Sequence, residues 1–108
     1  MDLHVRTDMV GATPVVALAG TADLGSVPAL QSALTRAITA HPGVEVAVDL
    51  DGLVVLDDTA LGVLLGAAGR ARSRGGDVVV VTTDDRMLAR LAETRFDHAV
   101  AVRPRITV

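Results

Sequence analysis

Short runs of valine, leucine and alanine alternate along this chain with longer stretches in which apolar residues recur three and four positions apart. The short runs are typical of β-strands and the longer stretches of amphipathic helices, which gives the order ββαβαβαβ. Strands that alternate with helices form a sheet with parallel neighbours, right-handed crossovers and helices packed on it. With 108 residues the chain is shorter than an average domain. We therefore predict a single α/β domain over residues 1–108.

Five strands are predicted, and the first two form a hairpin. They cover residues 2–9, 15–19, 44–50, 78–81 and 99–102. Leu3, Val5, Thr7 and Met9 alternate with polar residues, as in a half-exposed strand, whereas the apolar run 15–19 suits a strand covered on both faces. Asp51-Gly52 is expected to end the third strand, and the apolar run 53–56 then leads toward two aspartates.

Three helices are predicted between these strands. The first is capped by Asp23 or Ser26 and ends at the sequence 41–43, His-Pro-Gly. The second starts at residue 59 and ends at two glycines, and the third follows a cap at Asp84 or Asp85. The apolar positions expected to face the core are Leu61, Leu64, Leu65 and Ala68 in the second helix and Met87, Leu88 and Leu91 in the third. Gly62 and Gly66 are expected to let the second helix pack closely on the sheet.

Composition excludes several classes of function. Ten Arg and Lys against thirteen Asp and Glu give a net charge of −3, without the basic field that nucleic-acid binding requires. The absence of Cys excludes thiolate catalysis, disulfides and zinc–thiolate sites, and all ten basic residues are Arg, so lysine chemistry is excluded as well. His4, His41 and His98 are too far apart for a local metal motif. We expect no cofactor, no metal, no nucleic acid and no membrane partner, and a cytoplasmic location because no signal peptide is recognisable.

The most unusual segment is 56–62, Leu-Asp-Asp-Thr-Ala-Leu-Gly, which joins an apolar run directly to a helix. In open α/β sheets, ligands and partners bind at the carboxyl ends of the strands, where this segment is expected to lie. The unpaired N–H groups of a helix start favour a carboxylate or a phosphorylated hydroxyl. On local grounds alone, Asp58 is expected to cap the helix and Asp57 to stabilise its dipole.

This segment resembles the STAS domain of bacterial anti-sigma factor antagonists, the SpoIIAA-like family. The resemblance extends to Val48-Asp49-Leu50, to Arg74-Gly75-Gly76 before the valine run 78–81, and to the segment 18–24, which is similar to the family's G-E-L-D turn. Family members are non-catalytic modules that bind an anti-sigma factor, which is also a Ser/Thr kinase, and are switched off when that kinase phosphorylates a serine in D-[ST]-[ST]-G. The resemblance thus implies the STAS fold and a role in partner-switching control of transcription. The partner-binding residues that it implies here are Asp23, Asp57, Asp58, Thr59, Ala60 and Gly62.

The chain departs from the family motif at two positions, because Asp58 stands where the phosphorylated hydroxyl is expected and Ala60 where glycine is expected. A carboxylate carries about one negative charge and a phosphoserine roughly −1.5 to −2, so Asp58 would partly imitate the phosphorylated, non-binding state. Alternatively Asp58 pairs with an arginine of the partner and binding is constitutive. In a third reading Thr59 accepts the phosphate one position later.

Two other functions stay open. An acidic pair after an apolar strand is also found in phosphoaspartate receivers, where it holds Mg²⁺ beside the acceptor. Receivers use in addition a lysine at the end of a late strand, and Thr82-Thr83 stands at that place here. A small-ligand-binding STAS module is the other alternative. No nucleophile–base pair is assembled from neighbouring residues, so we do not expect an enzyme.

Overall fold

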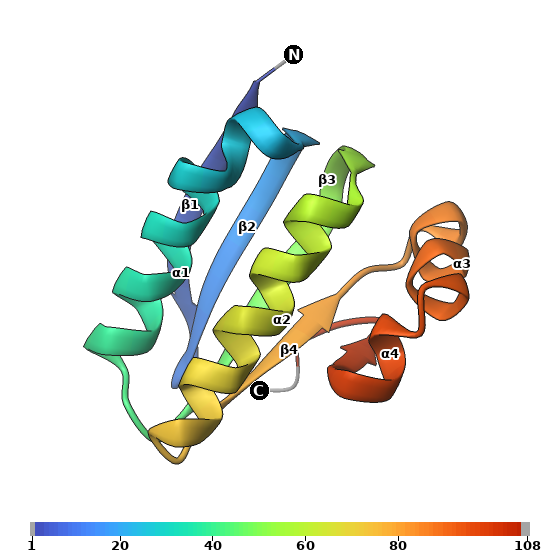
Figure 1. The fold of residues 1–108 in the computed structure, drawn as a ribbon. Helices are drawn as coiled ribbons and strands as arrows, with labels where there is room; N and C mark the ends of the chain where they lie inside the picture. The colour runs from blue at the N-terminus through green and yellow to red at the C-terminus, as the bar shows by residue number, and fades with distance from the viewer. Residues whose placement is uncertain (1, 107–108) are drawn as a thin grey trace.

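A five-stranded sheet carries the helices on one of its faces in the computed structural model, which describes residues 2–106 (Figure 1). The ends of the predicted domain, residues 1 and 107–108, lie outside the described residues. The strands follow one another in the order β1 (Leu3–Val10), β2 (Thr13–Ala22), β3 (Glu45–Leu56), β4 (Asp77–Val81) and β5 (Ala101–Arg103). β1 pairs antiparallel with β2, and all other neighbours are parallel. The predicted hairpin and parallel sheet are confirmed.

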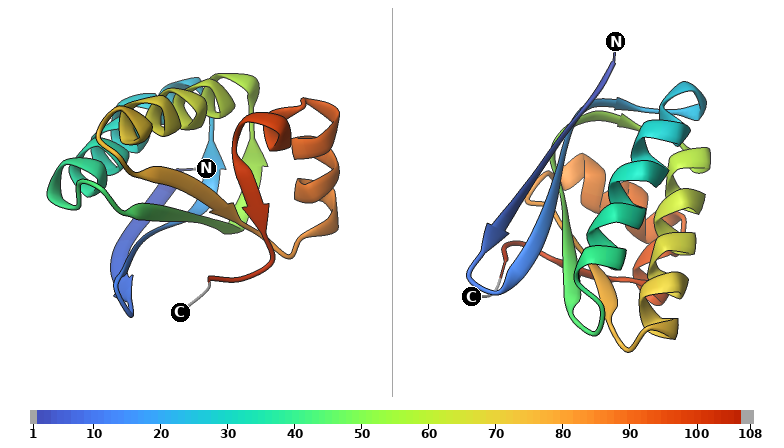
Figure 2. Two further views of the ribbon diagram at one scale, coloured as in Figure 1. Left: turned by 90° about the horizontal axis from the view of Figure 1, so that it is seen from below. Right: turned by 90° about the vertical axis from the view of Figure 1, so that its left-hand side faces the viewer.

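The crossovers between parallel strands are helical. They are η1 (Leu24–Ser26) with α1 (Val27–Ala40), then α2 (Asp58–Ser73), then α3 (Asp85–Glu93) with α4 (Phe96–Ala99). Figure 2 shows α1 and α2 side by side over one face of the sheet, with α3 and α4 beside the β4–β5 edge. The predicted order ββαβαβαβ is therefore confirmed, with the short helices η1 and α4 added. No helix among the described residues is long and apolar enough to cross a membrane.

The main core is aliphatic apart from Phe96 and lies between the sheet and the helices. Leu18, Leu34, Leu50 and Leu64 are almost completely buried in it. On the opposite face, Val15, Ala47, Val79 and Val81 form a second, smaller buried cluster, against which Ile106 packs. Val15 and Val16 therefore lie on opposite faces and are both buried, as the continuous apolar run predicts for a strand covered on both sides.

Several predicted boundaries are wrong. Asp51-Gly52 does not end the third strand, because β3 continues to Leu56 through an irregularity at which Ala17 and Ala19 of β2 face Asp49 and Gly52. Gly52 makes this close approach feasible, since a Cβ there would lie 2.7 Å from the Leu18 carbonyl oxygen. The last strand starts at Ala101, since Ala99 belongs to α4.

Two leucines predicted for the core are on the surface. Leu65 is 42% exposed and Leu88 38% exposed, whereas their helical neighbours Leu64, Met87 and Leu91 are buried as expected. Adjacent residues of an α-helix point about 100° apart, and Leu65 and Leu88 lie on the side of their helix that faces away from the core.

Candidate partner-binding surface

The start of α2 is held to the sheet by Asp57. The Asp57 N–H donates to the Ala22 carbonyl oxygen at the end of β2 (3.0 Å), and the Asp57 Oδ1 accepts from the Ala60 N–H (2.9 Å). Asp57 has extended dihedral angles, φ −86° and ψ 175°, as an N-cap residue requires. The local expectation that Asp58 is the cap is therefore wrong, because Asp58 is already the first residue of the helix.

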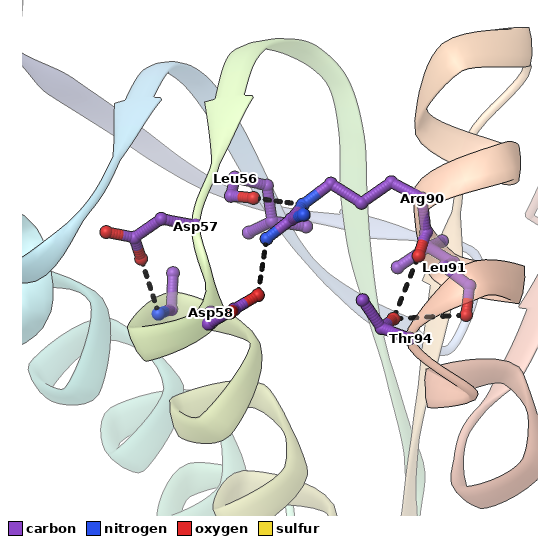
Figure 3. Close-up of polar contacts among 7 residues, drawn as sticks. Leu56, Asp57, Asp58, Arg90, Leu91 and Thr94 are labelled. Carbon is purple, nitrogen blue, oxygen red and sulfur yellow. Dashed lines mark hydrogen bonds and ion pairs between the residues drawn. The ribbon is translucent and has the colours of Figure 1, made fainter.

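Asp58 is free of the cap and pairs instead with an arginine from α3 (Figure 3). Arg90 Nη2 lies 2.8 Å from Asp58 Oδ1, and Arg90 Nε donates to the Leu56 carbonyl oxygen. The Asp58 side chain is 89% exposed and the Arg90 side chain 35% exposed. The pair therefore lies at the surface, and the charge of Asp58 is partly neutralised from within the chain.

Figure 3 shows the carboxylates of Asp57 and Asp58 pointing away from each other, one toward the helix backbone and one toward α3. Each has its own partner, so the two do not converge on a common point as they would around a shared Mg²⁺. Within residues 2–106 no three His, Asp or Glu side chains lie close enough together to hold a metal ion. This geometry does not favour the receiver reading.

The start of α3, the helix that carries Arg90, is fixed by hydrogen bonds to the segment that follows β4. Asp84 caps α3 by accepting from the Arg86 and Met87 N–H groups, and the Asp84 N–H donates to the Thr82 hydroxyl. Asp51 in turn joins the end of β4 to β3.

The Asp51 carboxylate accepts three hydrogen bonds from the segment between β4 and α3. Its Oδ1 accepts from the Thr82 hydroxyl (2.9 Å) and the Thr83 N–H (2.7 Å), and its Oδ2 from the Thr83 hydroxyl (3.0 Å). These bonds, led by that of the Thr83 N–H, lower the pKa of Asp51 below its ordinary value of 3.8. The residue expected to break a strand is thus a brace between β3 and the start of α3.

The remaining predicted site residues of α2 differ in accessibility. Thr59 is exposed in the first helical turn, but Ala60 is completely buried, so its side chain cannot contact a partner. Alanine suits this position because it lies inside the helix, where the positive φ that glycine permits is not needed. Ala60 is therefore removed from the surface, and Thr59 remains on it beside Asp58.

Gly62 and Gly66 do not pack on the sheet, which corrects the prediction. Both are exposed: a Cβ on Gly62 would meet no atom within 4 Å, and one on Gly66 would only touch the Arg70 guanidinium, at 3.5 Å. Gly69 is likewise open. Packing within the described chain therefore does not require glycine along this face of α2.

Asp23 lies at the neighbouring loop, where it caps η1 rather than α1. Its Oδ1 accepts from the Ser26 N–H (3.2 Å), while the Ser26 hydroxyl accepts from the Asp23 N–H (3.2 Å). The reciprocal bonds form a capping box, and the side chain is half-buried. Leu24, the next residue, is 71% exposed on η1, which contacts α2.

Sequence reasoning missed Arg90, Asp51 and the exposed apolar residues of this region. Arg90 lies 32 positions from Asp58 and Asp51 lies 31 from Thr82, so no local motif connects them. Val54 and Val55 are 55% and 43% exposed at the end of β3. The only sequence signal for these two valines is the continuous apolar run 53–56, because a strand with one solvent-exposed face would be expected to alternate apolar and polar residues.

A comparison with protein families gives a match over almost the whole chain. The family model described as "Mlab, STAS domain" matches residues 5–104. The chain belongs to the STAS domain family. A comparison with curated proteins found no match to this STAS domain.

Solved structures similar to this STAS domain include several anti-sigma factor antagonists. One from Mycobacterium paratuberculosis has a TM-score of 0.86 at 19% identity, over 97% of this chain and 88% of that one. An antagonist described as putative, from Thermotoga maritima, gives 0.82 at 14% identity, over 94% and 87%. The Bacillus cell fate determinant SpoIIAA in its phosphorylated form gives 0.68 at 17% identity, over 92% and 90%. The chain thus has the fold of the anti-sigma factor antagonists, as predicted.

Proposed function

We propose that this STAS domain is a non-catalytic, cytoplasmic protein-binding module of the anti-sigma factor antagonist type, whose partner is an anti-sigma factor related to Ser/Thr kinases. The observation that carries the proposal is the start of α2, where Asp58 and Thr59 are exposed and where the two elements that contact this helix, η1 and β3, also carry exposed apolar side chains. Exposed apolar side chains that are bordered by polar and charged residues mark a surface that binds another protein.

The Arg90 contact favours constitutive binding over a permanently inactive state. A phosphoserine carries roughly −1.5 to −2 charges, whereas Asp58 and Arg90 together carry none. The pair is therefore a poor imitation of a phosphorylated residue. We infer that Asp58 leaves the domain able to bind and removes the means of switching it off.

The open glycine face of α2 supports contact along the helix. Glycine inside a helix costs about 1 kcal/mol relative to alanine, and nothing in the described chain requires it at Gly62 or Gly69. A partner that approaches the α2 backbone closely would require it. The proposed surface therefore extends from Asp58 and Thr59 along α2 to Gly62 and Gly66, with Asp23 and Leu24 at its border.

Binding and phosphorylation assays test this proposal. The purified domain is titrated calorimetrically with each anti-sigma kinase of its organism, with and without ATP. We expect one kinase to bind the wild-type protein equally well in both conditions, without labelling position 58 and with little or no labelling of Thr59. Efficient stoichiometric phosphorylation of the wild-type protein, or no binding by any kinase, contradicts the proposal.

The variant Asp58→Ser restores the hydroxyl that the family motif carries. We expect the same kinase to phosphorylate it and ATP to weaken its binding, because a phosphate at position 58 exceeds the charge that Arg90 can balance. Asp58→Asn is the matched control, since it removes the charge without supplying a phosphoacceptor. If Asp58→Ser binds its kinase but stays unlabelled, the inferred loss of a switch is wrong.

A further inference from the structure

The outer edge of β1 presents unpaired backbone groups. Within residues 2–106 β1 pairs only with β2. The Thr21 N–H donates to the Asp2 carbonyl oxygen (3.3 Å), so even-numbered residues of this antiparallel pair direct their backbone groups toward β2. The odd-numbered residues from Leu3 to Met9 therefore direct theirs outward. The Met9 N–H accordingly bonds to the Asp8 Oδ1 (2.8 Å).

The side chains of Leu3, Val5, Thr7 and Met9 lie on the face of this strand toward the helices, and those of His4, Arg6 and Asp8 on the opposite face. Val5 packs against the main core, whereas Met9 is 47% exposed. A groove of about 510 Å³ lies between β1 and the end of α1, and its lining includes apolar Val5, Met9 and Ala37 as well as polar Thr7, Arg36 and His41. An exposed methionine beside an unfilled groove is a feature that a neighbouring strand would cover.

The charges on β1 select one way in which this edge can pair with itself. Since the odd-numbered residues direct their backbone groups outward in both copies, an odd-numbered residue must face an odd-numbered residue of the second copy. Among the antiparallel registers that satisfy this condition, four have their centre in the middle of the strand, at residue 5, 6, 7 or 8. Pairing centred on Arg6 places Arg6 opposite itself, pairing centred on Asp8 places Asp8 opposite itself, and pairing centred on Val5 places Arg6 opposite His4. Only pairing centred on Thr7 places Arg6 opposite Asp8 of the second copy, and does so twice by symmetry.

We propose that two copies of this chain associate through β1, antiparallel and centred on Thr7, so that their sheets become continuous. In this register Val5 lies opposite Met9 of the second copy on the helix side, and the methionines enter the grooves beside α1. The Met9 N–H exchanges its bond to Asp8 for the Val5 carbonyl oxygen of the second copy, which frees Asp8 to pair with Arg6 of that copy. The start of α2 follows β3 and is separated from this edge by β2, so the dimer leaves it free.

Sedimentation equilibrium of the full chain tests the dimer. We expect a concentration-dependent dimer for the wild type. Arg6→Asp and Asp8→Arg should each weaken association by about tenfold or more, because each places like charges opposite one another twice. Arg86→Asp is the matched control, since it makes the same charge change on α3, away from the edge, and should associate as the wild type does. Circular dichroism verifies that each variant is folded.

Mixing the two charge variants gives the decisive result. The Arg6→Asp chain carries aspartate at both positions 6 and 8, and the Asp8→Arg chain carries arginine at both. Opposite charges would therefore face each other at every contact, so we expect a heterodimer from two chains that are each monomeric alone. A monomeric wild type at all concentrations overturns the proposal, as does a dimer that neither charge variant weakens. Failure of the mixture to associate overturns the Thr7 register. None of these results depends on the proposed anti-sigma partner.

Discussion

At the level of single residues, the ion pair between Asp58 and Arg90 distinguishes this surface from a free acidic helix start. Exposed ion pairs contribute about 0.2–1 kcal/mol, and Asp58 is highly exposed. We therefore expect Asp58→Asn to lower the unfolding free energy by about 0.5 kcal/mol or less. Arg90→Ala should cost about 1–2 kcal/mol, because the Leu56 carbonyl oxygen also loses its donor.

Urea unfolding of both single variants and the double variant measures this coupling. The loss of unfolding free energy in the double variant should differ by about 0.5 kcal/mol from the sum of the two single losses, as expected of residues in contact. Strict additivity would show that the two side chains do not interact in solution, and it would remove the argument that the charge of Asp58 is neutralised.

The two adjacent aspartates should also differ in their effects on stability. Asp57→Ala removes the cap of α2 and should cost about 1 kcal/mol, whereas Asp58→Ala should cost less. Urea unfolding of the two variants makes the comparison. Equal losses, or a larger loss at position 58, would contradict the assignment of the cap.

The sequence could identify these aspartates as candidates but not assign their roles. Local rules place an acidic residue at a helix start, and two adjacent ones satisfy the rule equally well. The choice depends on where β3 ends, since Asp57 is tied to Ala22 of another strand. Arg90 was inaccessible to local reasoning because it reaches Asp58 only through the packing of α3.

At the level of secondary-structure elements, the brace at Asp51 holds the start of α3 to β3. The pKa of Asp51 is lowered in the folded chain, so its charged form stabilises the fold above its ordinary value of 3.8, and this contribution is lost as pH falls below it. Asp51→Asn should cost about 1 kcal/mol at pH 7.

The difference in unfolding free energy between wild type and Asp51→Asn should shrink as pH falls from about 5 to about 2. Denaturant titrations across this range measure it. A difference that is independent of pH would mean that the Asp51 charge does not contribute to the brace.

Replacing a glycine by alanine should have opposite effects on stability in α2 and in β3. Gly62→Ala should raise the unfolding free energy by about 0.5–1 kcal/mol, because the added methyl group meets only open space. Gly52→Ala should lower it, since its Cβ would contact the Leu18 carbonyl oxygen. Thermal unfolding measures both. If Gly62→Ala destabilises the chain, the glycine has an internal role and no longer supports a partner surface.

The sequence predicts well those elements that are determined by residues close to one another in the chain. The valine run of β4 and the cap of α3 at Asp84 have local determinants, and both lie where predicted. Asp51 in β3 is held by Thr82 and Thr83 from the segment between β4 and α3, so Asp51-Gly52 resembles a turn when the local sequence is considered alone. Phe96 holds α4 to the main core, and a helix of four residues is too short to be recognised by periodicity.

At the level of the whole molecule, the order of strands and helices was sufficient to predict the architecture. Strand–helix alternation and right-handed crossovers leave few arrangements for a chain of this length, and an aliphatic core fits all of them. The proposed partner surface could not be predicted in this way, because its residues come from η1, β3, α2 and α3, which are far apart in the sequence.

Site-specific photo-crosslinking in the native cell tests most directly whether the start of α2 is a partner surface. A photoreactive phenylalanine replaces Thr59, which is exposed beside Asp58, or Thr35, which is exposed on α1 and serves as the control. We expect position 59 to capture one protein, identified by mass spectrometry as an anti-sigma factor of the kinase type, and position 35 to capture none. Capture at position 35 but not at 59 would contradict the assignment of this surface.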